Sequence, residues 1–213
     1  MNFHYIAIEG PSAVGKTAVL ERLAERLDAV IVGEDWSANP FLKSFYDGKG
    51  GTAFQAEVFF LLSRFRQQQD LLQRKLFSSV TLSDYVFEKS RLYAYLNLED
   101  AELVIFEKLY GLLAESVPQP DLVVYLQASP ERLVRRVRER GRPGDQTIPE
   151  EYLQEICRAY NHYFFHYSRT PLLVVNTSEL DLVNRVDQVD DLLKQIDGMG
   201  RGTRYYVPLA DHS

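Results

Sequence analysis

The sequence predicts a single α/β domain in which a five-stranded parallel sheet is covered by helices on both faces. Five short runs of apolar residues alternate along the 213 residues with longer segments of helical periodicity. Neighbouring parallel strands need crossover connections, and helices usually provide them. No repeat or low-complexity tract interrupts this alternation. We therefore expect one domain over residues 1–213.

The N-terminal half contains three predicted strands and two predicted helices. Each strand is a short run of mostly apolar residues, and each helix has apolar residues at three- and four-residue intervals. A glycine-rich loop, 48–51, separates the second strand from the second helix. In chain order the predicted elements are strand Tyr5–Glu9, a helix up to Leu27, strand Ala29–Gly33, a helix from about Ala53 to Leu76, and strand Ser79–Ser83.

The C-terminal half continues the alternation. Ser129 and Pro130 supply an N-cap and a first-turn proline for an arginine-rich helix. Residues after about 198 are expected to form a tail that lies on the domain, with Tyr205 and Tyr206 as its docking point. The predicted elements are helix Asp100–Leu113, strand Leu122–Leu126, the arginine-rich helix, strand Leu172–Asn176 and helix Leu182–Ile196.

Residues 10–17, GPSAVGKT, match the pattern GxxxxGK[ST] between a predicted strand and a predicted helix, which is the context that a phosphate-binding loop requires. At average residue frequencies this pattern arises by chance in well under about 1% of chains of this length. Glycines let backbone N–H groups surround phosphate oxygens, and the following helix adds its positive end. The residues expected to bind ATP here are Gly10, Pro11, Ser12, Ala13, Val14, Gly15, Lys16 and Thr17.

Within this loop two side chains have predicted roles of their own. Lys16 is expected to neutralise the β- and γ-phosphates, and the Thr17 hydroxyl is expected to bind Mg²⁺. The loop therefore predicts a nucleoside triphosphate and leaves the acceptor open.

Phosphoryl transfer to a hydroxyl needs a carboxylate near the acceptor, a metal ligand and positive charge over the migrating group. Glu34 follows the second predicted strand, at the edge of the sheet where ligands usually bind; the alternative is a solvated turn acid. Asp84 ends the third predicted strand, where it either faces Thr17 across a magnesium ion or caps the next segment.

Six arginines and two glutamates lie between residues 131 and 142, so this segment carries a charge of +4 in a chain whose formal net charge is −6. A charge run is usually a solvated face. This one ends in a flexible glycine-containing segment, 141–145, so a lid that closes over phosphates is the competing interpretation. The acidic total argues against a nucleic-acid polymer as partner, whereas the local positive charge suits a triphosphate. The arginines are Arg132, Arg135, Arg136, Arg138, Arg140 and Arg142.

Eight motifs along the chain form a recognisable combination. They are GPSAVGKT, Glu34-Asp35, Asn39-Pro40-Phe41-Leu42, Phe45-Tyr46, FFLLSRFRQQ, SDYVFEK, PDLVVYLQASPE and RERGRP. Together they resemble the deoxyribonucleoside kinase family, especially its bacterial deoxyadenosine and deoxyguanosine kinase branch, over roughly residues 3–207. The resemblance implies the P-loop NTPase fold, ATP- and Mg²⁺-dependent phosphorylation of the 5′-hydroxyl of a deoxynucleoside with purines favoured, and a homodimer, or a heterodimer with a paralogue.

The resemblance also implies roles for individual residues. Glu34 is the general base for the 5′-hydroxyl, and a lid at about 136–146 brings Arg136 and Arg140 into catalysis and Arg142 to ATP. Many relatives have an acid-arginine-serine motif at the end of the third strand, whereas this chain has Ser83-Asp84-Tyr85, so the magnesium role of Asp84 is a hypothesis. The implied nucleoside-binding residues are Glu34, Tyr46, Glu57, Arg64, Asp84 and Asp145.

Glu57 departs from the family pattern, which usually has a base-binding glutamine at this position. Seven residues apart on the long predicted helix, Glu57 and Arg64 are expected to line one pocket wall. A glutamine amide suits adenine or cytosine, whereas an ionised carboxylate only accepts hydrogen bonds and suits N1–H and N2–H₂ of guanine. We therefore hypothesise a preference for deoxyguanosine. The alternatives are that Glu57 is protonated and mimics glutamine, that Glu57 forms an ion pair with Arg64, or that the activity is altered or lost.

Two other functions stay open. A nucleoside monophosphate kinase would use Arg64 for the acceptor's phosphate. The second is a nucleotide-binding module without turnover that partners an active subunit. Two departures from the family pattern allow this interpretation: Glu57 replaces the usual glutamine, and Ala13 stands where relatives often have glycine. The sequence has no apolar run of the roughly 20 residues that a membrane helix needs, no signal-peptide pattern, and a single cysteine. We expect a cytoplasmic protein without a membrane partner.

Overall fold

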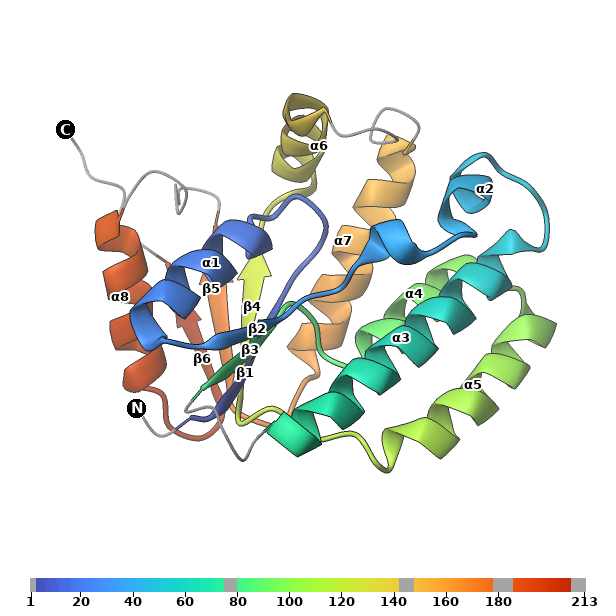
Figure 1. Cartoon of the computed structure of the whole chain (residues 1–213). Helices are drawn as coiled ribbons and strands as arrows, with labels where there is room; N and C mark the ends of the chain where they lie inside the picture. Colours follow the sequence, from blue (N-terminus) through green and yellow to red (C-terminus); the bar gives the residue numbers. More distant parts are fainter. Residues whose placement is uncertain (1–2, 75–79, 142–147, 178–185, 208–213) are drawn as a thin grey trace.

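A computed structural model describes residues 3–74, 80–141, 148–177 and 186–207 of the chain. Its described strands form one parallel sheet of six strands in the order β2-β3-β1-β4-β5-β6 (Figure 1). The strands are β1 (Tyr5–Glu9), β2 (Val30–Val32), β3 (Thr81–Ser83), β4 (Leu122–Gln127), β5 (Leu172–Asn176) and β6 (Thr203–Tyr206).

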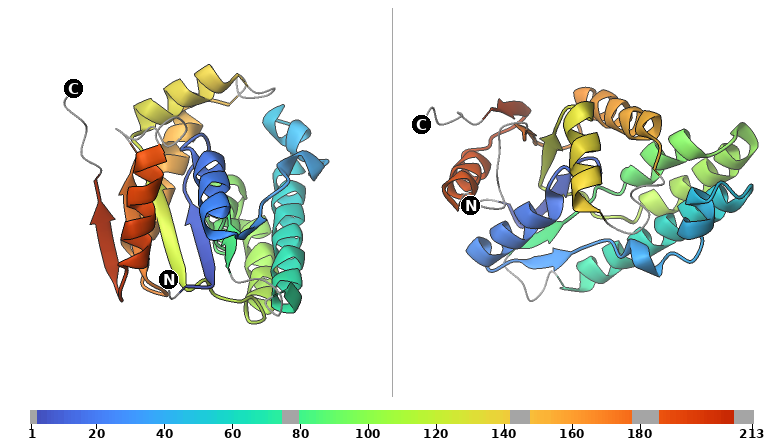
Figure 2. Two further views of the ribbon diagram at one scale, coloured as in Figure 1. Left: turned by 60° about the vertical axis from the view of Figure 1, so that its left-hand side comes forward. Right: turned by 90° about the horizontal axis from the view of Figure 1, so that it is seen from above.

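Both faces of the sheet are buried, because successive side chains of a strand point to opposite faces. Ile6 and Ile8 of β1 pack in one apolar cluster with α1 (Lys16–Leu27) and α8 (Val186–Asp197). Ala7 packs in the cluster on the other face with α7 (Glu150–Phe165) and α4 (Lys89–Asn97). The two views in Figure 2 show these helices on opposite sides of the sheet. Burial on both faces explains why the central strands have almost uninterrupted apolar sequences.

A further helical layer packs against α4. It consists of α3 (Thr52–Arg74) and α5 (Asp100–Ala114), which share an apolar cluster centred on Leu61, Ala94 and Phe106. The remaining helices are η1 (Trp36–Ala38), α2 (Leu42–Tyr46) and α6 (Pro130–Arg140). Ser129 caps α6 as expected, since its side chain accepts a hydrogen bond from the Arg132 N–H.

The sixth strand corrects the prediction of five. Residues 203–206, which we expected to belong to a tail, pair in parallel with β5, from Leu172 beside Thr203 to Val175 beside Tyr206. An edge strand needs only one buried face, and here Tyr206 packs on the core while Tyr205 is exposed. A search for continuous apolar runs misses such a strand. Helix α4 was not predicted either.

The predicted lid at 136–146 lies only partly within the described residues. Its first five residues, 136–140, form the end of α6, and Gly141 caps this helix in the left-handed conformation (φ 58°). Arg142 and Asp145 lie outside the described residues. Among the helices that are described, none combines the length and apolar character needed to span a membrane.

Candidate active site

A cavity of about 1240 Å³ opens at the carboxyl ends of the strands. Segments that follow β1, β2, β3 and β5 line it, together with residues of α2, α3, α4, α6 and α7. Ligands of open parallel sheets normally bind at this edge. The lining includes most of the residues singled out in the sequence: Ser12 to Thr17, Glu34, Tyr46, Glu57, Arg64, Asp84, Arg136 and Arg140.

The phosphate-binding loop has the sharp backbone that its glycines predict. A Cβ atom at Gly10 (φ 152°) would lie 2.6 Å from the Leu126 carbonyl oxygen, so this position requires glycine. Ala13 also has a positive φ, 63°, which alanine adopts only with strain. Gly10 and Pro11 form the base of the loop, and the cavity lining begins at Ser12.

Lys16, at the start of α1, donates hydrogen bonds to two carbonyl groups of its own loop, those of Gly10 and Pro11, the latter at 3.2 Å. Burial, followed by the charge of Lys89, lowers the pKa of Lys16 to about 8. The amine is therefore still mostly protonated at pH 7. The side chain of Thr17 is exposed at the cavity wall, as a metal-binding hydroxyl must be.

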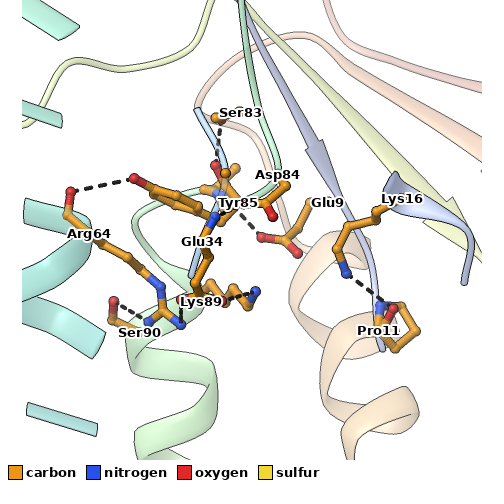
Figure 3. A network of polar contacts seen from close by, with 12 residues as sticks. Glu9, Pro11, Lys16, Glu34, Arg64, Ser83, Asp84, Tyr85, Lys89 and Ser90 are labelled. Carbon is orange, nitrogen blue, oxygen red and sulfur yellow. Dashed lines mark hydrogen bonds and ion pairs between the residues drawn. The ribbon is translucent and has the colours of Figure 1, made fainter. Parts of the chain in front are cut away.

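The Glu34 side chain is only 10% exposed and lies between two cations, so Glu34 is not a solvated turn acid (Figure 3). Its Oε1 lies 2.5 Å from Nη2 of Arg64, and its Oε2 accepts a hydrogen bond from Nζ of Lys89 at 2.9 Å. Burial raises the pKa of Glu34, but the charges of Arg64 and Lys89 outweigh burial and lower the pKa to about 2. The carboxylate is therefore ionised and held in place.

Asp84 and Thr17 line the same cavity. One oxygen of Asp84 accepts a hydrogen bond from the backbone N–H of Glu34 at 3.0 Å, which ties the end of β3 to the segment after β2. Mg²⁺ in phosphoryl-transfer sites is usually held by one or two carboxylates together with waters and substrate phosphates. Asp84 and Thr17 fit such a sparse site. Among the described residues there is no group of three His, Cys, Asp or Glu side chains that could hold a metal alone.

Glu57 lies in the wall formed by α3. Its Oε1 accepts a hydrogen bond from Nδ2 of Asn97 at 2.7 Å, and Tyr152 fixes that amide by donating to its oxygen at 2.8 Å. The other oxygen of Glu57, Oε2, is buried without a hydrogen-bond partner among the described residues. Burial raises the pKa of Glu57 to about 7, despite the Asn97 hydrogen bond and the Arg64 charge.

Arg64 lines the same wall, as the seven-residue spacing predicted. Its ion pair is formed with Glu34, and its Nη1 donates to Oγ of Ser90 at 2.8 Å. The predicted ion pair between Arg64 and Glu57 is therefore wrong. Nε of Arg64 is buried without a hydrogen-bond partner among the described residues.

The arginine run divides into two groups. Arg138 and Arg135 form surface ion pairs, with Glu150 at 2.7 Å and with Glu139 at 3.6 Å. The second group, Arg132, Arg136 and Arg140, lines the cavity.

Arg136 joins three parts of the site. It donates to the carbonyl groups of Val14, at 3.0 Å, and of Thr177, at 3.1 Å. It thereby connects α6 to the phosphate-binding loop and to the end of β5.

Several site residues escaped the sequence reasoning. Glu9 is fully buried and accepts hydrogen bonds from the backbone N–H groups of Gly10 and Val86, both at 2.9 Å, and from the Tyr160 hydroxyl at 3.1 Å. A charged residue at the end of an apolar strand was a usable signal for it. Lys89, Asn97 and Tyr152 had no comparable signal, because the tertiary fold alone brings them to the cavity.

Comparisons with known proteins support a family assignment. The sequence profile described as deoxynucleoside kinase matches residues 6–199. The chain is 33% identical over 157 residues to deoxyguanosine kinase of Bacillus subtilis, covering 73% of this chain and 76% of that protein. It is 24% identical to the deoxyadenosine/deoxycytidine kinase of the same organism, over 90% of each chain.

Among solved structures, deoxyadenosine kinase from M. mycoides with bound dCTP has a TM-score of 0.78 at 21% identity. The match covers 92% of this chain and 100% of that one, so the two proteins share a fold. The profile match spans strands β2 to β5, most of β1 and every cavity-lining residue, so the chain belongs to the deoxynucleoside kinase family.

Proposed function

We propose that this protein transfers the γ-phosphoryl group of ATP to the 5′-hydroxyl of a purine deoxynucleoside, with deoxyguanosine preferred. The observation that supports this most directly is the buried, ionised Glu34 in the same cavity as the phosphate-binding loop. In this proposal ATP binds at the loop and the lid arginines Arg136 and Arg140, and Mg²⁺, held by Thr17 and Asp84, supplies charge neutralisation of the phosphates.

The deoxynucleoside occupies the other end of the cavity, between α2, α3, α4 and α7. Glu57 contacts the base, Tyr46 contacts the sugar side, and Glu34 accepts the proton of the 5′-hydroxyl. Arg64 orients Glu34 through their ion pair. Outside the described residues, we retain Arg142 as an ATP contact and Asp145 as a nucleoside contact.

A direct test is to incubate the protein with ATP, Mg²⁺ and each deoxynucleoside or its monophosphate, and to measure ADP. We expect ADP with purine deoxynucleosides. ADP formation with monophosphates alone would support a nucleoside monophosphate kinase, and tight ATP binding without turnover would support a module that partners an active subunit. Either result would overturn this proposal.

The base preference rests on the unsatisfied carboxylate oxygen of Glu57. Asn97 occupies one oxygen, so Oε2 remains for a donor from the ligand. Guanine presents N1–H and N2–H₂ side by side, whereas adenine presents one acceptor beside one donor. The Glu57 carboxylate can accept hydrogen bonds from both of these guanine donors. These hydrogen bonds would offset the free-energy cost of burying the negative charge of Glu57. The 33% identical relative is a deoxyguanosine kinase, which agrees with this preference.

We expect Glu57→Gln to lower kcat/KM for deoxyguanosine relative to deoxyadenosine by about 10- to 100-fold, because an unpaired buried donor costs roughly 1–3 kcal/mol. In the wild type, KM for deoxyguanosine should decrease as the pH rises from about 6 to about 8, since Glu57 must ionise to accept hydrogen bonds from N1–H and N2–H₂ of guanine. The variant should lack this trend. The surface change Glu25→Gln is the matched control, and an unchanged base preference in Glu57→Gln would end the guanine assignment.

We also propose that the protein is a homodimer that associates through α5. Three apolar side chains of this helix are exposed to solvent, those of Val104, Ile105 and Leu112, and Leu112 is 77% exposed. Tyr95 of α4 is also exposed. The homodimer implied by the family resemblance makes a second copy the natural partner for this face.

Leu112→Glu should convert the dimer to a monomer, because a two-fold interface would bring the new charge in from both copies. Light scattering coupled to size-exclusion chromatography measures the mass. Tyr205→Glu, on the exposed strand β6, is the control and should leave the dimer intact. A monomeric wild type, or a Leu112→Glu variant with unchanged mass, would contradict the assignment of this interface.

A further inference from the structure

Lys89 is a buried cation in the cavity to which the proposed mechanism has so far given no chemical role. It is the first residue of α4, only 8% exposed, and its Nζ lies 2.9 Å from Oε2 of Glu34. The Tyr93 ring packs nearby, with its centroid 5.9 Å from Nζ. Lys89 therefore touches the residue proposed to take the substrate's proton.

Burial of the Lys89 ammonium requires a charged partner, and Glu34 provides it. Lysine is almost never buried unless it is paired. A positive charge at a helix N-terminus opposes the helix dipole. The N-cap residue Glu88 forms an ion pair with Arg169, and the first turn of α4 contains no acidic residue. Proteins place a lysine in the interior or at a helix N-terminus mainly at functional sites, so this placement points to a function for Lys89.

Residues 84–88, which directly follow β3, include no cation. Many relatives have an acid-arginine-serine motif at this strand end. Here Tyr85 follows Asp84 and is buried, with its hydroxyl donating to Gln67 at 2.7 Å. Lys89, reaching back from the next helix, supplies the positive charge instead.

Lys89 and Lys16 approach the same space from opposite sides. Figure 3 shows the Lys89 amine on the side of Glu34 that faces Lys16 and the phosphate-binding loop. The two amines are close enough for the charge of Lys89 to help lower the pKa of Lys16. Burial lowers the pKa of Lys89, but Glu34 and Glu9 outweigh burial and raise it, so Lys89 is an ammonium at neutral pH. Two ammonium groups that face one space suit an anion between them.

We propose that Lys89 is a catalytic residue whose ammonium contacts Glu34 in this structure and donates a hydrogen bond to the γ-phosphoryl group during transfer. This inference rests on the proposed function, because it requires ATP and a hydroxyl acceptor in the cavity.

The step balances with Lys89 keeping its proton throughout. The bond between the γ-phosphorus and the β,γ-bridging oxygen breaks, and ADP leaves with that electron pair. The bond from the 5′-oxygen to the γ-phosphorus forms, and the hydroxyl proton passes to Glu34. When Lys89 moves its hydrogen bond from Oε2 to the phosphoryl group, Oε2 becomes free to accept that proton. This single movement of Lys89 thus frees the general base, Glu34, and adds positive charge at the γ-phosphoryl group, where negative charge develops during transfer.

The test compares Lys89→Met, Lys89→Arg and Lys89→Ala with the wild type, using Lys194→Met on the surface of α8 as the control. We expect Lys89→Met to lower kcat by about 100-fold, with KM for ATP and for the deoxynucleoside within about three-fold, because the lost donor acts in the transition state. Lys89→Arg should recover at least about 10-fold of that loss. Ethylammonium should partly restore kcat of Lys89→Ala, whereas potassium at the same ionic strength should not.

A structural role would give different results. If Lys89→Met keeps kcat within about three-fold of the wild type, or if ethylammonium fails to restore Lys89→Ala while its unfolding transition matches the wild type, the proposal is wrong. Glu34→Gln provides a second check: if Lys89 only positioned Glu34, adding Lys89→Met to that variant would cause no further loss, whereas we expect a further drop of about 10-fold. A wild type that phosphorylates no deoxynucleoside would instead refute the proposed function.

Discussion

Glu34→Gln should lower kcat by about 10²- to 10⁴-fold, the range that a positioned general base contributes, while the Kd of ATP stays within about two-fold. Glutamine has nearly the same shape and still accepts a hydrogen bond from Lys89 or Arg64, so the substitution removes basicity and leaves the cavity in place. Steady-state kinetics and ATP titration measure the two quantities.

Glu25→Gln again serves as the surface control for this experiment, since Glu25 is exposed on α1. A kcat near the wild-type value in Glu34→Gln would show that the 5′-hydroxyl loses its proton without help from this carboxylate. It would also weaken the proposed role of Lys89, which rests partly on Oε2 becoming free.

Arg64→Met should destabilise the protein by about 3–5 kcal/mol, because removing one member of a buried ion pair leaves the partner charge uncompensated. Arg64 is 2% exposed, contacts Glu34 and Ser90, and also helps to hold down the pKa of Glu57. Urea unfolding at pH 7 gives the free energy of unfolding. Arg66→Met, at an exposed position of the same helix, is the matched control, and we expect no more than about 0.5 kcal/mol from it.

The pH dependence of stability checks the same interaction independently. The pKa of Glu34 is lowered to about 2 in the folded protein from its ordinary 4.5, so its ion pairs stabilise the fold fully above about pH 4.5. That contribution is lost as the pH falls from 4.5 towards 2. Arg64→Met should flatten this part of the stability curve, and a curve with the wild-type slope would contradict the assignment. Loss of less than about 1 kcal/mol at pH 7 would do so as well.

The sheet was predictable because its buried central strands must be apolar along their whole length. The strands through Ile8, Leu82 and Val174 were found within two residues of their observed bounds for this reason. Edge strand β6 is exposed on one side, so its sequence, Thr-Arg-Tyr-Tyr, lacks that signal. Helix α4 packs against three other helices, which removes the one-sided apolar stripe that identifies a surface helix.

The site was predictable where chain topology alone brings residues together. Lys16, Glu34 and Asp84 each follow a parallel strand, and the carboxyl ends of neighbouring parallel strands meet at one edge of the sheet. The choice of partner within the site was not predictable in the same way. Glu57 and Arg64 share a helix face, yet Arg64 pairs with Glu34, because the distance across the cavity depends on how α3 packs against the sheet.

The seven-residue spacing of Glu57 and Arg64 fixes the distance between these two residues along the axis of α3. Seven residues of α-helix span about 10 Å, which is close to the length of a nucleoside from the base edge to the 5′-oxygen. In the proposed function, a nucleoside whose base contacts Glu57 has its 5′-oxygen level with Arg64 and with Glu34, the ion-pair partner of Arg64. An acceptor that already carried a phosphate would be too long for this span and would press its charge against the Glu34 carboxylate. In the proposed function, the length of this helix segment therefore favours unphosphorylated acceptors.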